Sequence, residues 1–216
     1  MEVTDATARP VDSLLACYCA GSLSPAMHAL VASHLMLSSD SAGFVSALES
    51  ALGESLASEM AQPVPDRDAR LAAIFDAPEA VAAALPECGI LPPPLRSLVG
   101  LDFAALKWRT KLPGIKECRI SAEGEGEANL LWIKAGRKIP FHTHGGSEVT
   151  LVLQGAFRDA AGHYARGDLA IADGSVNHQP VVDADADCIC FAVTDAPLRM
   201  TGPVGRIVER LFGHSH

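Results

Sequence analysis

Apolar residues recur every three or four positions through the first 85 residues, which is the pattern of helices with one buried face. Ser24 followed by Pro25 is a typical helix start, and apolar side chains continue at helical spacing from there to Leu35. A small helical bundle with a thin core is therefore expected. Its four helices would cover about Val11–Ala20, Pro25–Leu35, Ala42–Glu59 and a short stretch from Asp66 or Asp68 to Phe75.

The pattern changes beyond residue 100, where short runs rich in β-branched residues alternate with turns that contain glycine. Many short strands at close spacing are typical of a sandwich or a barrel. A short helix is expected near the C-terminus, at Val204–Phe212. The clearest strand candidates are Ala128–Ile133, Val149–Val152, Asp168–Ala172 and Cys188–Val193.

Three consecutive prolines, Pro92 to Pro94, separate the two patterns and favour an extended, semi-rigid spacer. The predicted organisation is a helical domain over residues 1–85, a proline-rich linker over 86–100 and a β-domain over 101–213. The fold class is thus α+β, with a small helical bundle preceding an all-β barrel.

Charge is distributed unevenly between these parts. Residues 1–90 contain three basic and twelve acidic side chains, so they carry the whole net charge of −9. Such a surface repels phosphates, which argues against direct binding of nucleic acid. It is compatible with a basic protein partner, although a solvated helical surface would have the same composition.

No run approaches the ~18 apolar residues of a membrane span, and the N-terminus lacks the basic and apolar segments of a secretory signal. A cytoplasmic protein without membrane contact is therefore expected. The six cysteines are too scattered for a disulfide scaffold. Cys188 and Cys190 would share one face of a strand, where buried thiols are the simplest interpretation and oxidation of one thiol is the alternative.

A metal site is predicted in the β-domain. His142 and His144 lie two residues apart, so in a strand both imidazoles point to one face. Gly145 and Gly146 allow a tight turn that would return Glu148 to the same place, and His178 offers a third imidazole. Three imidazoles and one carboxylate suit zinc, iron(II), manganese or nickel without selecting one.

The segment from Gly136 to Gly155 resembles the first motif of the cupin superfamily. Its glycine, the two histidines of HxH, the glutamate and the second glycine match at every position: Gly136, His142, His144, Glu148 and Gly155. In the second motif Gly167 and His178 match, whereas Asp173, Ser175 and Val182 replace its proline, glycine and asparagine. The resemblance implies a cupin barrel, a double-stranded β-helix or jelly roll, that binds one divalent metal ion.

The chain also resembles ChrR-type anti-sigma factors through LLACYCAGSLSPAMHALVASHL and through PFHTHGGSEVTLVLQGAFRDAAGHYARGDLAIADGSVNHQPV. In that family a helical domain sequesters an extracytoplasmic-function sigma factor, and a cupin domain is needed to release it under singlet oxygen or organic hydroperoxides. The resemblance implies a negative transcriptional regulator whose residues 1–85 bind the sigma factor. It also implies that His142, His144, Glu148 and His178 hold zinc.

One departure concerns the helical domain. The family carries zinc there on His-x3-Cys-x2-Cys, whereas this chain has His34 followed by Ser38 and Ser41. A serine hydroxyl is a poor zinc ligand compared with a thiolate, so no zinc is expected in this domain and His34 becomes an ordinary helix residue. The domain would then bind a sigma factor by hydrophobic packing alone, or serve for dimerisation.

The alternative function is a metal-dependent cupin enzyme, a dioxygenase or an isomerase, with the helical domain used to form a homodimer. No general base other than Glu148 lies near the motif, and polar residues such as Asp159 and His163 are expected on a turn between strands. The attached helical domain favours the regulator, because a minimal cupin enzyme does not need it. We therefore predict no catalytic residues.

Overall fold

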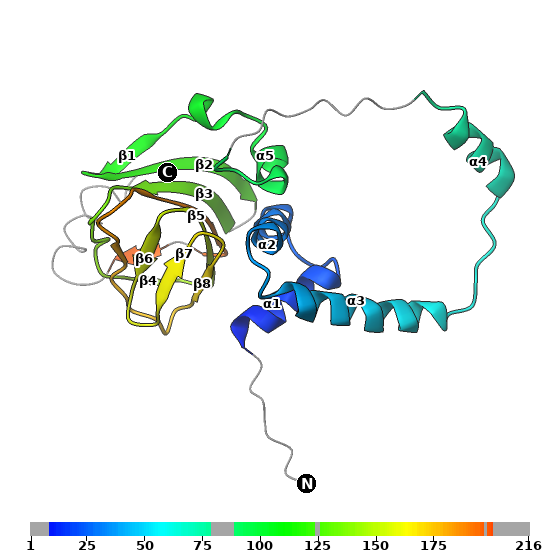
Figure 1. Ribbon diagram of the computed structural model, residues 1–216, viewed down its shortest axis with the longest axis horizontal. Helices are drawn as coiled ribbons and strands as arrows, with labels where there is room; N and C mark the ends of the chain where they lie inside the picture. The colour runs from blue at the N-terminus through cyan, green and yellow to red at the C-terminus, as the bar shows by residue number, and fades with distance from the viewer. Residues whose placement is uncertain (1–8, 79–88, 124–125, 197, 201–216) are drawn as a thin grey trace, which may run out of the picture.

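A computed structural model describes residues 9–78, 89–123, 126–196 and 198–200. It consists of a β-barrel with a layer of helices against one outer face, as Figure 1 shows. The predicted terminal helix at 204–212 lies outside the described residues. No helix in the described part of the chain is long and apolar enough to cross a membrane.

The barrel is built on a six-stranded antiparallel sheet, with two smaller sheets closing it. Each of the four predicted strands is present within about two residues of the expected ends. The large sheet has the order β1 (Arg109–Leu112), β2 (Ile115–Glu123), β3 (Gly126–Ile133), β10 (Cys188–Thr194), β5 (Glu148–Gln154) and β8 (Leu169–Ala172). One smaller sheet pairs β11 (Leu198–Met200) with β4 (His142–His144). The other has the order β7 (His163–Ala165), β6 (Ala156–Arg158) and β9 (Val181–Val182).

The helices predicted from the apolar pattern are also present, and the helix–barrel fold class is confirmed. Helix α1 contacts both α2 and α3, whereas α4 lies apart from them in Figure 1 and has no buried residue. Their bounds are α1 (Pro10–Cys19), α2 (Pro25–Leu37), α3 (Ala42–Ala57), α4 (Arg67–Phe75), α5 (Pro93–Val99) and the short 3-10 helix η1 (Phe103–Ala105).

The large sheet has two buried faces because side chains alternate along each strand. On β3, Leu130 belongs to a core shared with the helices, whereas Leu131 faces the barrel interior. On β10, Phe191 faces the helices and Cys190 the interior. Since α1 contacts β8 and α2 contacts β10, the helical layer and the barrel are held together by one continuous apolar core.

The expected extended spacer is in part a helix. Pro93 and Pro94 occupy the first two positions of α5, where a missing backbone N–H costs nothing and the fixed φ of proline suits the helix. Leu91 and Leu95 are buried, and α5 packs against α2. The expectation of an extended spacer is therefore wrong for residues 93–99, which join the helical layer.

His34 connects α2 to the barrel. Its Nδ1 donates to the carbonyl oxygen of Gly167 at 2.7 Å, and its Nε2 lies 2.9 Å from Oγ of Ser41. Gly167 has a φ of +95°, and a Cβ there would lie 3.1 Å from the backbone oxygen of Leu37. His34 is buried between the two layers, so the interpretation of this residue as an ordinary helix residue is corrected.

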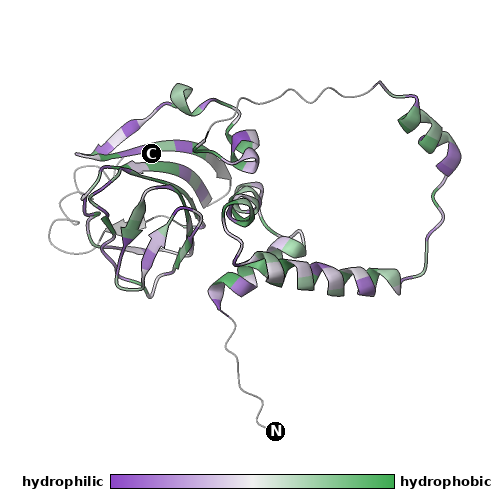
Figure 2. Cartoon of the chain, viewed as in Figure 1, coloured by the Kyte–Doolittle hydropathy of each residue, from purple (hydrophilic) through white to green (hydrophobic). Residues whose placement is uncertain are grey.

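Apolar side chains are exposed on the two helices farthest from the barrel. On α3 they are Phe44, Leu52 and Leu56, and on α4 they include Phe75, which is 82% exposed. Figure 2 shows hydrophobic residues as green segments along both helices. Single exposed apolar residues are common, but a series of large ones along two helices indicates a surface that another molecule covers. The members are Phe44, Leu52, Leu56, Leu71, Ile74 and Phe75, here called the α3–α4 apolar face.

Candidate metal centre

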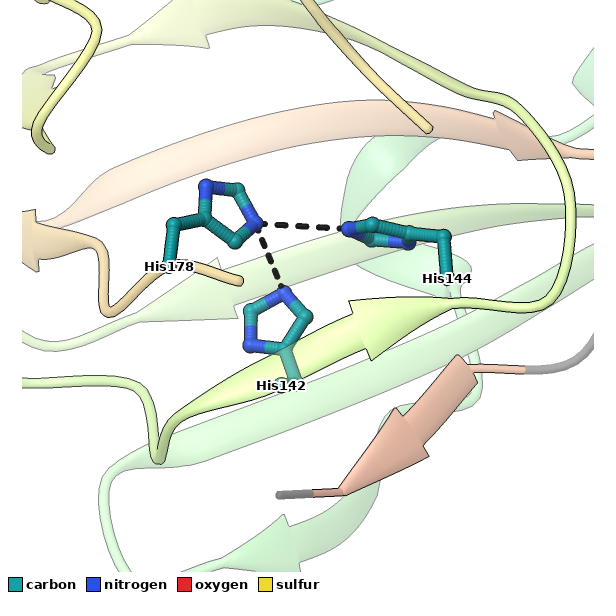
Figure 3. A group of neighbouring side chains, drawn as sticks. All are labelled: His142, His144 and His178. Carbon is teal, nitrogen blue, oxygen red and sulfur yellow. Dashed lines mark hydrogen bonds between the residues drawn. The ribbon is translucent and has the colours of Figure 1, made fainter. Parts of the chain in front are cut away.

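The three predicted histidines come together inside the barrel. His142 and His144 begin and end β4, and His178 forms a β-bridge to His142 through two backbone hydrogen bonds of 3.2 and 3.1 Å. This pairing places a residue from the second motif directly opposite one from the first. The side chains of all three point to the same place (Figure 3).

Their ring nitrogens are close enough to share one ion. Nε2 of His178 lies 3.0 Å from Nε2 of His142 and 3.3 Å from Nε2 of His144. One ligand atom from each residue falls within 4.8 Å of the others, and all three residues are buried. Converging imidazole nitrogens in a buried pocket are the arrangement that zinc, iron, copper or nickel prefer.

Glu148 lies at the edge of this group. It begins β5, and its Oε2 is 3.6 Å from Nδ1 of His144, while its Oε1 accepts a hydrogen bond from Thr150 at 3.1 Å. Nδ1 of His144 is buried and has no hydrogen-bond partner among the described residues. The three imidazoles fit a divalent cation, whereas Glu148 lies outside the group of ligand atoms that fall within 4.8 Å of one another, so its place as a fourth ligand stays a prediction.

Burial keeps two of the imidazoles, those of His142 and His144, neutral. Removal from water lowers the pKa of His142 to about 4, and burial also lowers the pKa of His144. Because neutral imidazole has a free lone pair and imidazolium has none, these two histidines are ready to coordinate a cation at neutral pH.

Asp159, which the sequence places on a turn between strands, contacts the centre through His178. It does lie on the turn between β6 and β7, yet its side chain is buried and its Oδ2 accepts from Nδ1 of His178 at 2.7 Å. Nδ1 of His142 is likewise held by the carbonyl oxygen of Pro140 at 2.9 Å. Both hydrogen bonds leave Nε2 free to coordinate, which is how metal-binding histidines are usually oriented.

The two cysteines of β10 lie near this centre as buried thiols, as expected. Their Sγ atoms are 3.4 Å apart. The contact with the Cys188 thiol, together with burial, raises the pKa of the Cys190 thiol. Cys190 is therefore protonated at neutral pH, and it lines a cavity of about 410 Å³ that also reaches His142, His178 and Glu148.

Known proteins resemble this chain over the helices as well as the barrel. Residues 97–197 match the ChrR cupin-like domain family. The chain is 39% identical over 208 residues to the anti-sigma-E factor ChrR of Cereibacter sphaeroides, covering 93% of this chain and 95% of that protein. The crystal structure of Rhodobacter sphaeroides SigE in complex with the anti-sigma ChrR matches with a TM-score of 0.70 and 38% identity, over 85% of this chain and 96% of that chain.

Proposed function

Because this chain belongs to the ChrR family of anti-sigma factors, we propose that it sequesters an extracytoplasmic-function sigma factor and releases it under oxidative stress. Identity at this level over both the helices and the barrel indicates a regulator rather than an enzyme. The cupin enzyme with a degenerate helical domain is thereby set aside. The expected domain boundaries, with residues 1–85 as the partner-binding part, belong to the same proposal.

The α3–α4 apolar face is the observation that carries this function. Leu56 is 75% exposed and Phe75 is 82% exposed, although helices of a monomeric protein normally turn such residues inward. Helices with one unburied apolar face bind partners by placing that face in a groove. We therefore assign the contact with the sigma factor to α3 and α4.

The charge of the helical part supports a protein partner with a basic surface. The net charge of −9 lies entirely in residues 1–90, the part that contains the α3–α4 apolar face. Complementary charge speeds association and disfavours wrong partners, and apolar contacts then supply most of the affinity. A sigma factor bound in this way is kept from the transcription machinery.

We further propose that the metal of the centre is zinc, held by His142, His144, His178 and Glu148. Zinc takes three imidazoles and one carboxylate in a four-coordinate site, and it supplies a fixed charge that locks the ligands together. In this site His142 and His178 present Nε2 to the centre, and Asp159 holds His178 in orientation. For residues 1–85 we propose no zinc, since Ser41 contacts His34 where the family has a cysteine.

Release would pass from the barrel to the helices through their shared core. The centre opens onto the inner face of β5 and β10, and α2 packs on the outer face of β10. An oxidant that modifies a metal ligand or a nearby thiol changes packing on the inner face. Because β10 is buried on both faces, a shift of β10 also alters its packing against α2.

Substitution on α3 tests the proposal. The full chain is co-expressed with each extracytoplasmic-function sigma factor of its source genome and purified by an affinity tag. We expect one of them to co-purify, and we expect Leu52→Asp/Leu56→Asp to weaken its binding at least ~100-fold, because charges would enter an apolar interface. Affinity is measured by biolayer interferometry.

The matched control is Ser46→Asp/Ser50→Asp, which adds the same charge at two exposed positions of α3 outside the apolar face. This variant should bind within about threefold of the unmodified chain, since rim charges contribute little. Equal loss of sigma-factor affinity in both variants would show that added negative charge, and not loss of the apolar contact, weakens binding. Failure of every sigma factor to bind the unmodified chain would refute the anti-sigma function.

A further inference from the structure

The barrel cavity changes in polarity along its length, and we propose that it binds a small neutral amphiphile. The molecule has a hydroxyl group at the end beside the histidines and an aliphatic body at the opposite end. The cavity volume of about 410 Å³ is within the range of sites for small molecules. The proposal does not require the sigma factor and goes beyond the function proposed above, although the choice of head group rests on the metal ion proposed there.

Strand register sets the direction of the gradient. The residues of β3 that line the cavity run from polar to apolar in the order Glu127, Asn129, Leu131 and Ile133. Thr194 pairs with both Glu127 and Glu148, so the polar end is the end of the metal centre. Ile115 pairs with Ile133 at the other end. A molecule inside the barrel therefore meets carboxylates and amide at one end and hydrocarbon at the other.

Asn129 identifies the group needed at the polar end. It is 8% exposed, and its Nδ2 donates to Oε2 of Glu127 at 3.3 Å. A carboxylate only accepts hydrogen bonds, which fixes the amide with its nitrogen toward Glu127. Oδ1 then has no partner among the described residues. A buried acceptor left in this state is unfavourable, and because Asn129 lines the cavity, a bound molecule there can supply the missing donor.

The head group must be a neutral donor. A carboxylate cannot donate to Oδ1 of Asn129, and Lys111, which lines the cavity, already pairs with Glu117 at 2.8 Å. An ammonium group would be repelled by the divalent ion proposed for the centre, and a carboxylate placed at Asn129 would lie beside the carboxylate of Glu127, which Asn129 contacts. A hydroxyl satisfies both conditions, since it donates one hydrogen bond and carries no charge.

The body of the molecule follows from the other walls. Leu131, Ile133, Phe157 and Val182 line the inner end, with the protonated thiol of Cys190. Water there would lack the two to four polar partners that an ordered buried water needs. At about 30 Å³ for each water, the volume corresponds to roughly a dozen non-hydrogen atoms, which is enough for a chain of about eight to ten carbons and its oxygen.

The test uses 1-octanol as the probe and the full chain with isotope-labelled isoleucine methyl groups. We expect saturable shifts of the Ile115 and Ile133 methyl signals at octanol concentrations below about 1 mM. Octanoate, which lacks the donor, should bind at least about fivefold more weakly. Absence of saturable shifts at these two residues, or tighter binding of octanoate, would overturn the proposal.

Two variants separate the cavity from surface binding. Ala170→Leu fills the cavity and should abolish the shifts, whereas Ala165→Leu on exposed β7 should leave them unchanged. Asn129→Leu should weaken octanol at least about fivefold, the effect of one hydrogen bond, and remove the preference over octanoate. Equal octanol affinity in all three variants would show that octanol does not bind in the barrel cavity. Since no sigma factor is present, this result is independent of the proposed anti-sigma function.

Discussion

Replacing Leu30 with alanine is expected to lower the free energy of unfolding by about 2–5 kcal/mol, and to destabilise the helices and the barrel together. Leu30 lies on α2, is fully buried, and belongs to the core that also contains Leu151 and Phe191 of the barrel. Loss of its side chain leaves a cavity at the contact between the layers. Coupling through this contact is what would let a change in the barrel reach the helices.

Urea unfolding followed by two probes measures this effect. Fluorescence of Trp108 and Trp132 reports on the β-part, and far-ultraviolet circular dichroism reports mainly on the helices. In Leu30→Ala both transitions should move together to lower urea. Met36→Ala, an exposed position at 59% on the same helix, should change stability by less than about 0.5 kcal/mol. A fluorescence transition that stays at the original urea concentration would show that the two layers unfold independently.

Removing one imidazole of the centre should cause a large loss of zinc affinity. We expect His178→Ala to reduce zinc affinity more than about a hundredfold, because a lost ligand costs more than a lost residue that only orients one. Asp159→Ala, which removes the acceptor at Nδ1 of His178, should reduce it by about 10–100-fold. Competition with a chromophoric zinc chelator measures both.

His163 offers a matched control for these variants. It lies on β7 close to Asp159 in the chain, yet it pairs with Asp183 on the surface and is 53% exposed. His163→Ala should bind zinc like the unmodified chain. If His178→Ala also bound zinc unchanged, the assignment of the centre to the histidine triad would be wrong.

Sequence patterns predicted the elements of this fold better than their assembly. The helical period located α1 to α4, and the strand period located β3, β5, β8 and β10, because each period records which side of an element is buried. It does not record what covers that side. The packing of α2 on the sheet, and the helix at Pro93–Val99, depend on contacts between residues distant in the chain.

The same distinction holds for the candidate site. His142 and His144 could be predicted as neighbours because two residues of a strand share a face, and the motif spacing pointed to His178. Asp159 could not be assigned to the site, because turn residues face either solvent or the barrel and only the folded hairpin decides which. His34 was misjudged for a related reason, since its acceptor is the carbonyl of Gly167 in the other half of the chain.

The zinc content of the purified complex with the sigma factor tests whether this chain is a metal-loaded anti-sigma factor. Elemental analysis of a one-to-one complex, purified without chelators, gives the number of zinc ions for each copy of this chain. We expect one, bound in the barrel, which His178→Ala removes without abolishing sigma binding. Two zinc ions would show that the helical part retains a metal site despite Ser38 and Ser41, and no zinc, or no complex, would contradict a metal-loaded anti-sigma factor.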